Sequence, residues 1–294
     1  MSAGNLTATE ETSGPAQAGF HWPAVVWFGL LLLLAYAPVL NRLVRQWISD
    51  PDMGHGLFVP VVAGYLAWSR RQEIAAAPLA VNWWGLPLVL YGSFQMMIGT
   101  LGAELFLSRT AFLISLTGML LLLSGLPLLR ILAFPLFLLL FMIPIPRVIF
   151  NQIALPLQLL ASQVAETALG LLGVPVLREG NILELASQRL NVVEACSGIR
   201  SLLSLSFLAM VYAYFFDEKP WMRAVLLAAS VPIAILANAS RVAITGILGE
   251  YDTALAEGFF HSAEGWVIFL ISLAALFFTH RLVNGGYALA RKHR

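Results

Sequence analysis

Repeated apolar blocks constrain this chain more than any other feature of its sequence. A helix needs about 20 apolar residues to cross the roughly 30 Å of hydrocarbon in a bilayer. Hydropathy places the blocks at roughly Pro23–Leu40, Gly56–Trp68, Trp84–Leu101, Ala111–Leu128, Ile131–Ile145, Ser197–Phe216, Ala224–Leu248 and Gly265–Val283. They predict an all-α fold, a polytopic transmembrane helical bundle with about eight spans. The second and fifth blocks are short for full spans.

The composition supports a protein that folds in lipid. Of its 294 residues, 59% are hydrophobic and only 11% are charged, and the mean hydropathy is +0.82. Too little polar surface is available to cover a water-soluble globule of this size. We expect residues 1–19 to be a disordered cytoplasmic tail without signal-peptide features, residues 20–286 to form one transmembrane domain, and residues 287–294 to be a basic cytoplasmic tail.

The charges in the short connecting segments predict the orientation of the bundle. Lysine and arginine collect in cytoplasmic loops of membrane proteins. With a cytoplasmic N-terminus, the alternating spans place these basic residues on the cytoplasmic side: Arg70, Arg71, Arg130, Lys219, Arg223 and Arg281. The opposite loops hold most of the acidic residues, although six arginines there dilute the asymmetry. Both termini are therefore predicted to be cytoplasmic.

The stretch from about residue 150 to residue 195 fits neither a plain span nor a simple loop. Polar residues recur between Asn151 and Leu172 at intervals near three to four, which collects most of them on one helical face. Such a helix could lie in the outer interface, span the bilayer with its polar face toward a cavity, or simply pack against the bundle. Turn residues between short apolar runs at 173–185 then predict an extended or hairpin-like segment outside the membrane.

Three chemically complementary residues are predicted to meet on the outer face. Cys196, the only cysteine, lies at the outer start of the sixth span, and Arg241 lies near the outer end of the seventh. His261 falls in the connection Gly249–Glu264, just before the last span. Taken singly, each has an ordinary interpretation: a buried thiol, an arginine that reaches the headgroups, and a loop histidine. Their joint position favours a functional site.

Thiol acyl transfer is the chemistry that needs such a set. A thiolate is the attacking species, and a nearby imidazole or guanidinium lowers the pKa of the thiol or accepts its proton. His261 fits the base, and Ser197 and Gly198 would offer free N–H groups at a helix start beside Cys196. Arg241 would stabilise the oxyanion. Asn238, one turn before it, could bind the substrate backbone or orient the arginine.

These motifs resemble the exosortase family, membrane-embedded cysteine transpeptidases of Gram-negative bacteria. The resemblance rests on residues 194–200 (Glu-Ala-Cys-Ser-Gly-Ile-Arg), on Asn-x-x-Arg at 238–241, and on His261 followed by Gly-Trp at 265–266. A weaker likeness begins at residues 53–56, Met-Gly-His-Gly. The similarity extends from about residue 48 to residue 278.

The resemblance implies a catalytic set of Cys196, Arg241 and His261, with Glu194, Ser197, Gly198, Arg200 and Asn238 as substrate-binding or supporting residues. It further implies that C-terminally anchored proteins with PEP-CTERM sorting signals are cut on the periplasmic side of the inner membrane. The cut substrate protein would then be transferred to an acceptor, in connection with exopolysaccharide production or surface protein sorting.

Other classes remain as alternatives to this interpretation. A small-solute transporter should show internal repeats or paired broken spans, and no convincing repeat is present. A non-catalytic membrane protein of polysaccharide assembly or export would tolerate Cys196→Ala.

The charge pattern and the histidine spacing predict no nucleic-acid or metal site. A net charge of +1 without a long basic run gives no positively charged surface for nucleic acid. The five histidines have no ligand-like spacing, so we expect neither a metal nor another cofactor.

The predicted orientation can be tested with topology reporters. Fusions at Lys219 and at Asp252 should report opposite sides of the membrane, with Asp252 outside, because one predicted span separates them. Paired alkaline phosphatase and fluorescent-protein fusions measure this directly. The same side for both fusions would contradict the shared outer face of Cys196, Arg241 and His261.

Overall fold

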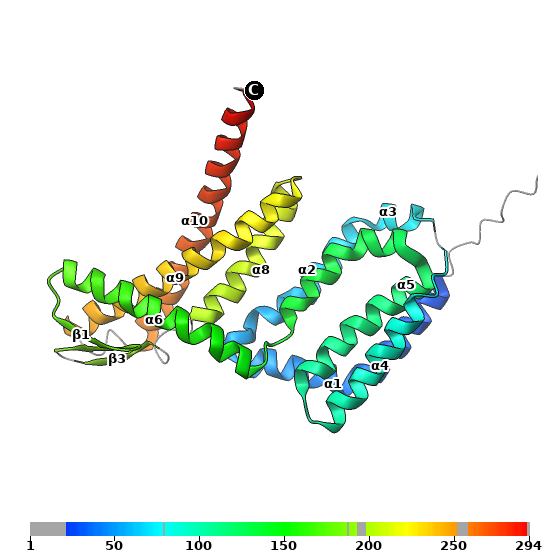
Figure 1. The fold of residues 1–294 in the computed structure, drawn as a ribbon, viewed down its shortest axis with the longest axis horizontal. Helices are drawn as coiled ribbons and strands as arrows, with labels where there is room; N and C mark the ends of the chain where they lie inside the picture. Colours follow the sequence, from blue (N-terminus) through cyan, green and yellow to red (C-terminus); the bar gives the residue numbers. More distant parts are fainter. Residues whose placement is uncertain (1–21, 79, 187, 193–197, 252–257, 293–294) are drawn as a thin grey trace, which may run out of the picture.

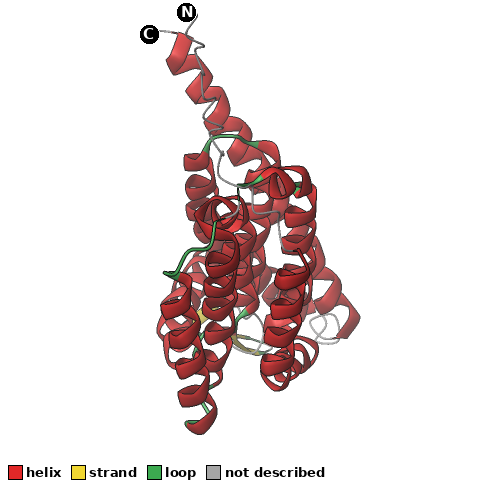
Figure 2. Ribbon diagram, turned by 90° about the vertical axis from the view of Figure 1, so that its right-hand side faces the viewer, coloured by secondary structure: helices red, strands yellow, loops and turns green. Residues whose placement is uncertain are grey.

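A computed structural model describes residues 22–78, 80–186, 188–192, 198–251 and 258–292 (Figure 1). The elements are α1 (Trp22–Ser49), η1 (Pro51–Leu57), α2 (Phe58–Ser69), α3 (Arg71–Ala76), α4 (Gly85–Leu101), α5 (Leu105–Leu138), η2 (Leu139–Met142), α6 (Arg147–Leu171), β1 (Val176–Glu179), β2 (Ile182–Leu185), β3 (Arg189–Asn191), α8 (Gly198–Phe216), α9 (Pro220–Tyr251) and α10 (Gly258–Lys292). Figure 2 shows that nearly all of this chain is helical. The predicted all-α bundle is confirmed.

The helices have the length and composition of membrane spans. Among the described residues, five segments are long and apolar enough to cross a bilayer: Pro23–Ser49, Leu105–Met142, Arg147–Leu171, Pro220–Glu250 and Gly265–Lys292. Two shorter apolar helices accompany them, Gly85–Leu101 and Arg200–Phe216. The chain is therefore a multi-pass membrane protein. The predicted block Gly56–Trp68 corresponds to α2, which has only 12 residues; at 1.5 Å per residue it is about 18 Å long, less than the hydrocarbon thickness.

The longest of these segments consists of two legs that reverse direction at one glycine. Leu105–Met142 has 38 residues, and a continuous helix of that length would measure about 57 Å, nearly twice the hydrocarbon thickness. Gly125 interrupts it with φ 79° and ψ −175°, a backbone conformation open essentially only to glycine. The second leg returns beside α2, as the green ribbon in Figure 1 shows. Two crossings agree with the two blocks predicted for this part of the sequence.

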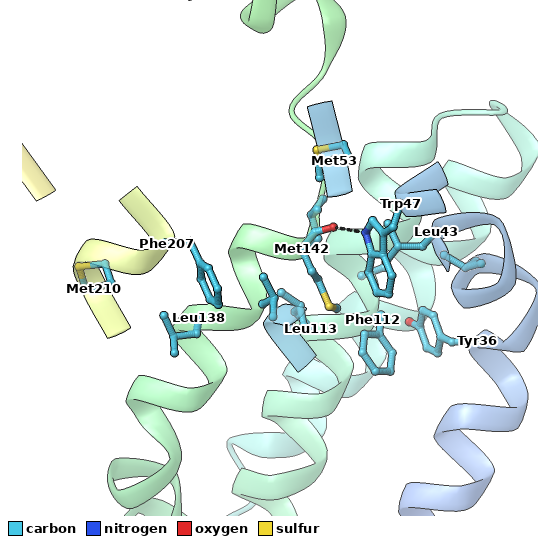
Figure 3. Close-up of a cluster of buried hydrophobic side chains, with 14 of the residues drawn as sticks. Tyr36, Leu43, Trp47, Met53, Phe112, Leu113, Leu138, Met142, Phe207 and Met210 are labelled. Atoms are coloured by element: carbon cyan, nitrogen blue, oxygen red, sulfur yellow. Dashed lines mark hydrogen bonds between the residues drawn. The ribbon is translucent and has the colours of Figure 1, made fainter. Parts of the chain in front are cut away.

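A buried cluster ties the end of α1 to the turn that follows the second leg. The indole Nε1 of Trp47 donates a hydrogen bond of 2.9 Å to the carbonyl oxygen of Met142 (Figure 3). This carbonyl would accept from the N–H four residues ahead in a continuing helix, but Pro146 has no N–H. The side chain of Trp47 supplies the missing donor. Gly56 lies against the indole and leaves no room for a Cβ.

The second half of the chain places a small antiparallel sheet against α9. The strand order is β1-β2-β3, and Gly180 and Asn181 form a two-residue turn in which Gly180 has φ 65°. A buried cluster joins this sheet to α6 and α9, with Leu183 and Val242 both fully buried in it. The predicted extended segment is confirmed as a hairpin followed by a short third strand.

Helix α6 binds this hairpin through its polar face. The hydroxyl of Ser162 donates to the carbonyl oxygen of Gly180 at 3.0 Å, and Arg178 pairs with Glu166 at 2.6 Å. In Figure 1, α6 lies across α8 and α9 rather than parallel to them. This direction and these contacts favour the interfacial interpretation of the polar stripe.

Aromatic and cationic side chains join the two halves at the end opposite the sheet. The rings of Phe134 and Tyr214 stack with centroids 4.3 Å apart. The guanidinium of Arg223 lies 5.0 Å from the first ring and 5.1 Å from the second, and Arg70 lies 5.6 Å from Tyr214. Each such contact contributes about 0.5 to 2 kcal/mol, depending on how far it is desolvated. The arginines predicted to be cytoplasmic therefore also fasten α2, α5, α8 and α9 together.

Substitution of Gly125 tests the reversal between the two legs. Gly125→Ala should lower the thermal unfolding midpoint in detergent strongly, because the new Cβ would overlap the carbonyl oxygen of Ala80 and φ is positive. Gly173→Ala is the matched control, since Gly173 has φ 78° but no atom within 4 Å of the new Cβ. The control should lose about 1 to 3 kcal/mol from backbone strain alone. Tryptophan fluorescence reports unfolding, and equal losses for the two variants would contradict a packed reversal at Gly125.

Candidate functional site

The segment that precedes α8 contains the predicted nucleophile. Glu194, Cys196 and Ser197 lie in residues 193–197, outside the described residues. Gly198 is the first residue of α8, so Cys196 stands two positions before a helix N-terminus in the sequence. Unpaired N–H groups and the helix dipole favour an anion at such a terminus, including a thiolate.

Arg200 is fixed in the first turn of α8 by a residue far away in the sequence. Its Nε and a terminal guanidinium nitrogen each lie 3.0 Å from Oδ1 of Asp52 in η1. The arginine side chain is 47% exposed, so the pair contributes at most about 1 kcal/mol to stability. Its main effect is positional, because it holds η1 against the helix that follows Cys196. Sequence reasoning assigned Arg200 a supporting role but missed Asp52, since no local pattern connects residues 148 positions apart.

Arg241 packs against the beginning of α10. Its guanidinium carbon Cζ lies 3.4 Å from the point that a Cβ on Gly265 would occupy. Glycine at this position therefore allows the half-buried guanidinium to rest against the backbone of α10. His261 lies four residues earlier, and positions four apart share one face of a helix. The register thus places position 261 one turn from the point where Arg241 meets α10.

The secondary structure of His261 differs from the expectation. The prediction that it lies in a loop is wrong, because α10 begins at Gly258 and the backbone of His261 is helical. Residues 258–264 mix apolar and polar side chains, so hydropathy placed the start of the apolar block only at Gly265. The side chain of His261 lies outside the described part of the structure.

Asn238 is buried in the packing between three helices. It is 7% exposed and lines a cavity of about 10 Å³ with Leu157 of α6 and Leu202 of α8. A space of that size holds about one water molecule and excludes a peptide. Of the two roles predicted for Asn238, contact with the substrate backbone is disfavoured by this burial, and orientation of Arg241 stays a prediction.

A side-chain contact holds the sheet near the part of α9 that carries Arg241. The side-chain amide of Gln188, beside β3, donates to the carbonyl oxygens of Thr245 and Gly246 at 3.4 Å each. This contact holds the end of the sheet against α9 one turn beyond Arg241. Leu202 of α8 and Asn238 of α9 line one cavity, and Arg241 of α9 meets Gly265 of α10, so segments distant in the sequence lie near one another.

An open cleft lies beside the start of α8. It has a volume of about 590 Å³ and is lined by the end of α1, η1, the connection to α6 and the second turn of α8. Its polar lining includes Gln46, Asp50, Asp52, Arg147 and Asn151. Sequence analysis assigned no role to Gln46, and it counted Arg147 only among the six arginines of the outer loops.

His55 lies next to this cleft in η1 and carries a perturbed imidazole. Burial lowers the pKa of His55 from the usual 6.5, and the carbonyl of Phe141 partly offsets that effect. The imidazole is therefore neutral at pH 7. Among the described residues, no group of three or more histidine, cysteine, aspartate or glutamate side chains is placed to hold a metal ion.

Comparison with known families decides the identity of the chain. A sequence profile of the transmembrane exosortase family matches residues 47–278, well over half of the chain. The chain belongs to the transmembrane exosortase family. The matched region begins at Trp47 and includes η1, the segment 193–197, Arg241 and His261. No curated protein and no solved structure matches the chain.

The lowered pKa of His55 predicts a pH-dependent stability. The unfolded chain binds a proton to this imidazole near pH 6.5, whereas the folded chain does so only at lower pH. The free energy of unfolding should therefore fall as the pH drops below about 6.5. His55→Gln should weaken that fall, as measured by thermal unfolding in detergent between pH 5 and pH 8. The same pH profile in both proteins would show that His55 is not buried in its neutral form.

Proposed function

We propose that this exosortase-family protein is a membrane cysteine peptidase and transpeptidase that cuts C-terminal sorting signals of the PEP-CTERM type. One observation carries the proposal: Arg241 rests against α10 one turn from position 261, at the same end as the helix that follows Cys196. In this proposal, the thiol of Cys196 and the imidazole of His261 act beside the cation of Arg241. Family membership supports the same chemistry.

The reaction proceeds through an acyl enzyme. His261 accepts the proton of the Cys196 thiol, and the thiolate attacks the carbonyl carbon of the scissile peptide bond. Arg241 stabilises the negative charge that develops on the carbonyl oxygen. Protonated His261 then donates its proton to the leaving amine, which departs with the C-terminal signal, and a thioester remains on Cys196. An acceptor nucleophile attacks that thioester and restores the free thiol.

Neighbouring residues support these three groups. The ion pair of Arg200 with Asp52 holds the start of α8 in place. Buried Asn238 fixes the segment of α9 that carries Arg241. Ser197 and Gly198 supply backbone N–H groups at the helix start, and Glu194 precedes Cys196 as a further supporting side chain.

In this proposal, the end of the bundle that carries β1, β2 and β3 faces the periplasm. Both termini are on the cytoplasmic side of the inner membrane. Arg70 and Arg223 lie at the opposite end, in contact with Tyr214. Lysine and arginine concentrate on the cytoplasmic side of membrane proteins. The proposed reaction therefore occurs outside the cytoplasm, where the chain of the substrate protein leaves the membrane.

Alanine substitutions test the three catalytic roles. A C-terminally anchored substrate with a PEP-CTERM-type signal is expressed together with each variant, and its processing is followed by gel mobility. Cys196→Ala should abolish processing because no thioester can form. Arg241→Ala should slow it by about 100- to 1000-fold, the usual effect of losing one oxyanion-stabilising group, and His261→Ala should also slow it severely.

The control is Arg45→Ala, because Arg45 is an exposed arginine that bonds Asn41 one turn earlier in α1. It should leave processing unchanged, and immunoblots should show all variants in the membrane at similar levels. Undiminished processing by Cys196→Ala would remove the proposed function.

A further inference from the structure

The 590 Å³ cleft beside α8 has the size of a binding site and is not used by the proposed catalytic residues. Sites for ligands typically measure about 300 to 1,000 Å³. Its walls come from α1, η1, α6 and α8, so it is built by segments more than 150 residues apart, from Gln46 to Leu203. Its lining mixes polar and apolar side chains, which suits a peptide better than a lipid chain.

Among the charged residues that line the cleft, Arg147 is available to pair with a ligand. Asp50 accepts the backbone N–H of Asp52 at 3.0 Å and the amide of Gln46 at 3.4 Å, and Asp52 pairs with Arg200. Within the described ranges, Arg147 has no carboxylate within 4.0 Å and its side chain is exposed. Arg147 is also the first residue of α6, where the helix dipole disfavours a cation. Stability of the helix thus does not account for an arginine at this position.

The position of the cleft connects it to the segment of Cys196. Leu203 of α8 lines the cleft, and so does Asp52, which pairs with Arg200 of α8. Arg200 lies only four residues after Cys196 in the sequence. A peptide bound in the cleft would therefore leave it beside the start of α8.

An apolar groove follows the cleft along α1. Gln46 lines the cleft, and the next residue, Trp47, lines a groove of about 390 Å³ between α1, α2 and α5 together with its hydrogen-bond partner Met142. Figure 3 shows how these two residues meet. A polar site and an apolar groove thus follow one another along the same wall. A chain that is polar outside the membrane and apolar inside it matches that order.

We propose that this cleft binds the polar segment of the substrate next to its membrane-spanning signal, and that Arg147 pairs with a carboxylate in that segment. The apolar signal helix then lies along the groove beneath Trp47. Arg147 is a specificity residue in this arrangement and takes no part in bond cleavage. The inference rests on the proposed function, because that function supplies a substrate with this sequence of polar and apolar parts.

Charge reversal tests the pairing. Arg147→Glu should lower processing of a substrate that has an acidic residue beside its signal helix by about tenfold or more, because two like charges then face each other. Replacing that acidic residue by lysine should restore processing by Arg147→Glu and lower it for the wild type. The control Arg45→Glu reverses an exposed arginine of α1 that lies outside the cleft lining. Unchanged processing by Arg147→Glu, or loss without rescue by the lysine substrate, would overturn the pairing.

A cross-linking experiment tests binding without catalysis. Cys196→Ala removes the only cysteine, so a second substitution introduces a unique thiol. Asn151→Cys in this background should form a disulfide with a substrate that carries one cysteine beside its signal helix. Ser69→Cys, at the opposite end of α2, should not. Equal cross-linking at both positions, or none at Asn151→Cys, would overturn the cleft as the binding site.

The two experiments separate the inference from the proposed function. Persistent processing by Cys196→Ala alone would overturn the function, whereas cross-linking needs no thiol at position 196. Loss of processing by Cys196→Ala together with no cross-link at Asn151→Cys would support the proposed function and rule out the cleft as the binding site of the substrate.

Discussion

The hydrogen bond from the indole of Trp47 to the carbonyl oxygen of Met142 lies where the membrane part of this protein meets its polar end. Pro146 cannot donate to that carbonyl, and an unsatisfied carbonyl inside lipid costs several kcal/mol. The indole removes this cost and thereby fixes the end of α1 against the end of η2. Because Gly56 packs directly on the indole, η1 is held there as well. Trp47 and Met142 also line the apolar groove of about 390 Å³ between α1, α2 and α5.

Long-range polar contacts then hold the segments on which the proposed site depends. Asp52 holds Arg200, and Gln188 holds the end of the sheet on α9. The opposite end has its own buried network, in which Asp217 accepts from Asn284 at 2.9 Å and lies 3.0 Å from Nε2 of His280. Side chains from different helices therefore make polar contacts at both ends of the bundle.

Much of the fold follows from local sequence signals. Apolar blocks predicted the helices, and Gly180-Asn181 between apolar runs predicted the hairpin, because a short turn of this kind needs a residue that tolerates positive φ. The polar stripe of α6 could be seen in the sequence, but the hairpin that it binds could not be identified there. Ser162 and Glu166 bind the hairpin, and only the folded chain brings the hairpin back over α6. The length of α10 was underestimated because polar residues are mixed with apolar ones at 258–264.

By itself, the sequence determined that the chain is a multi-pass helical membrane protein and which residue types its site contains, since hydropathy and short motifs are local properties. It indicated Cys196, Arg241 and His261 through spacing relative to the spans, and their roles remain proposals. Only the tertiary structure decided that Gly265 admits the guanidinium of Arg241, that Asp52 pairs with Arg200, and that Arg147 faces a cleft. These contacts join residues far apart in the chain, and their geometry depends on how the helices pack in three dimensions.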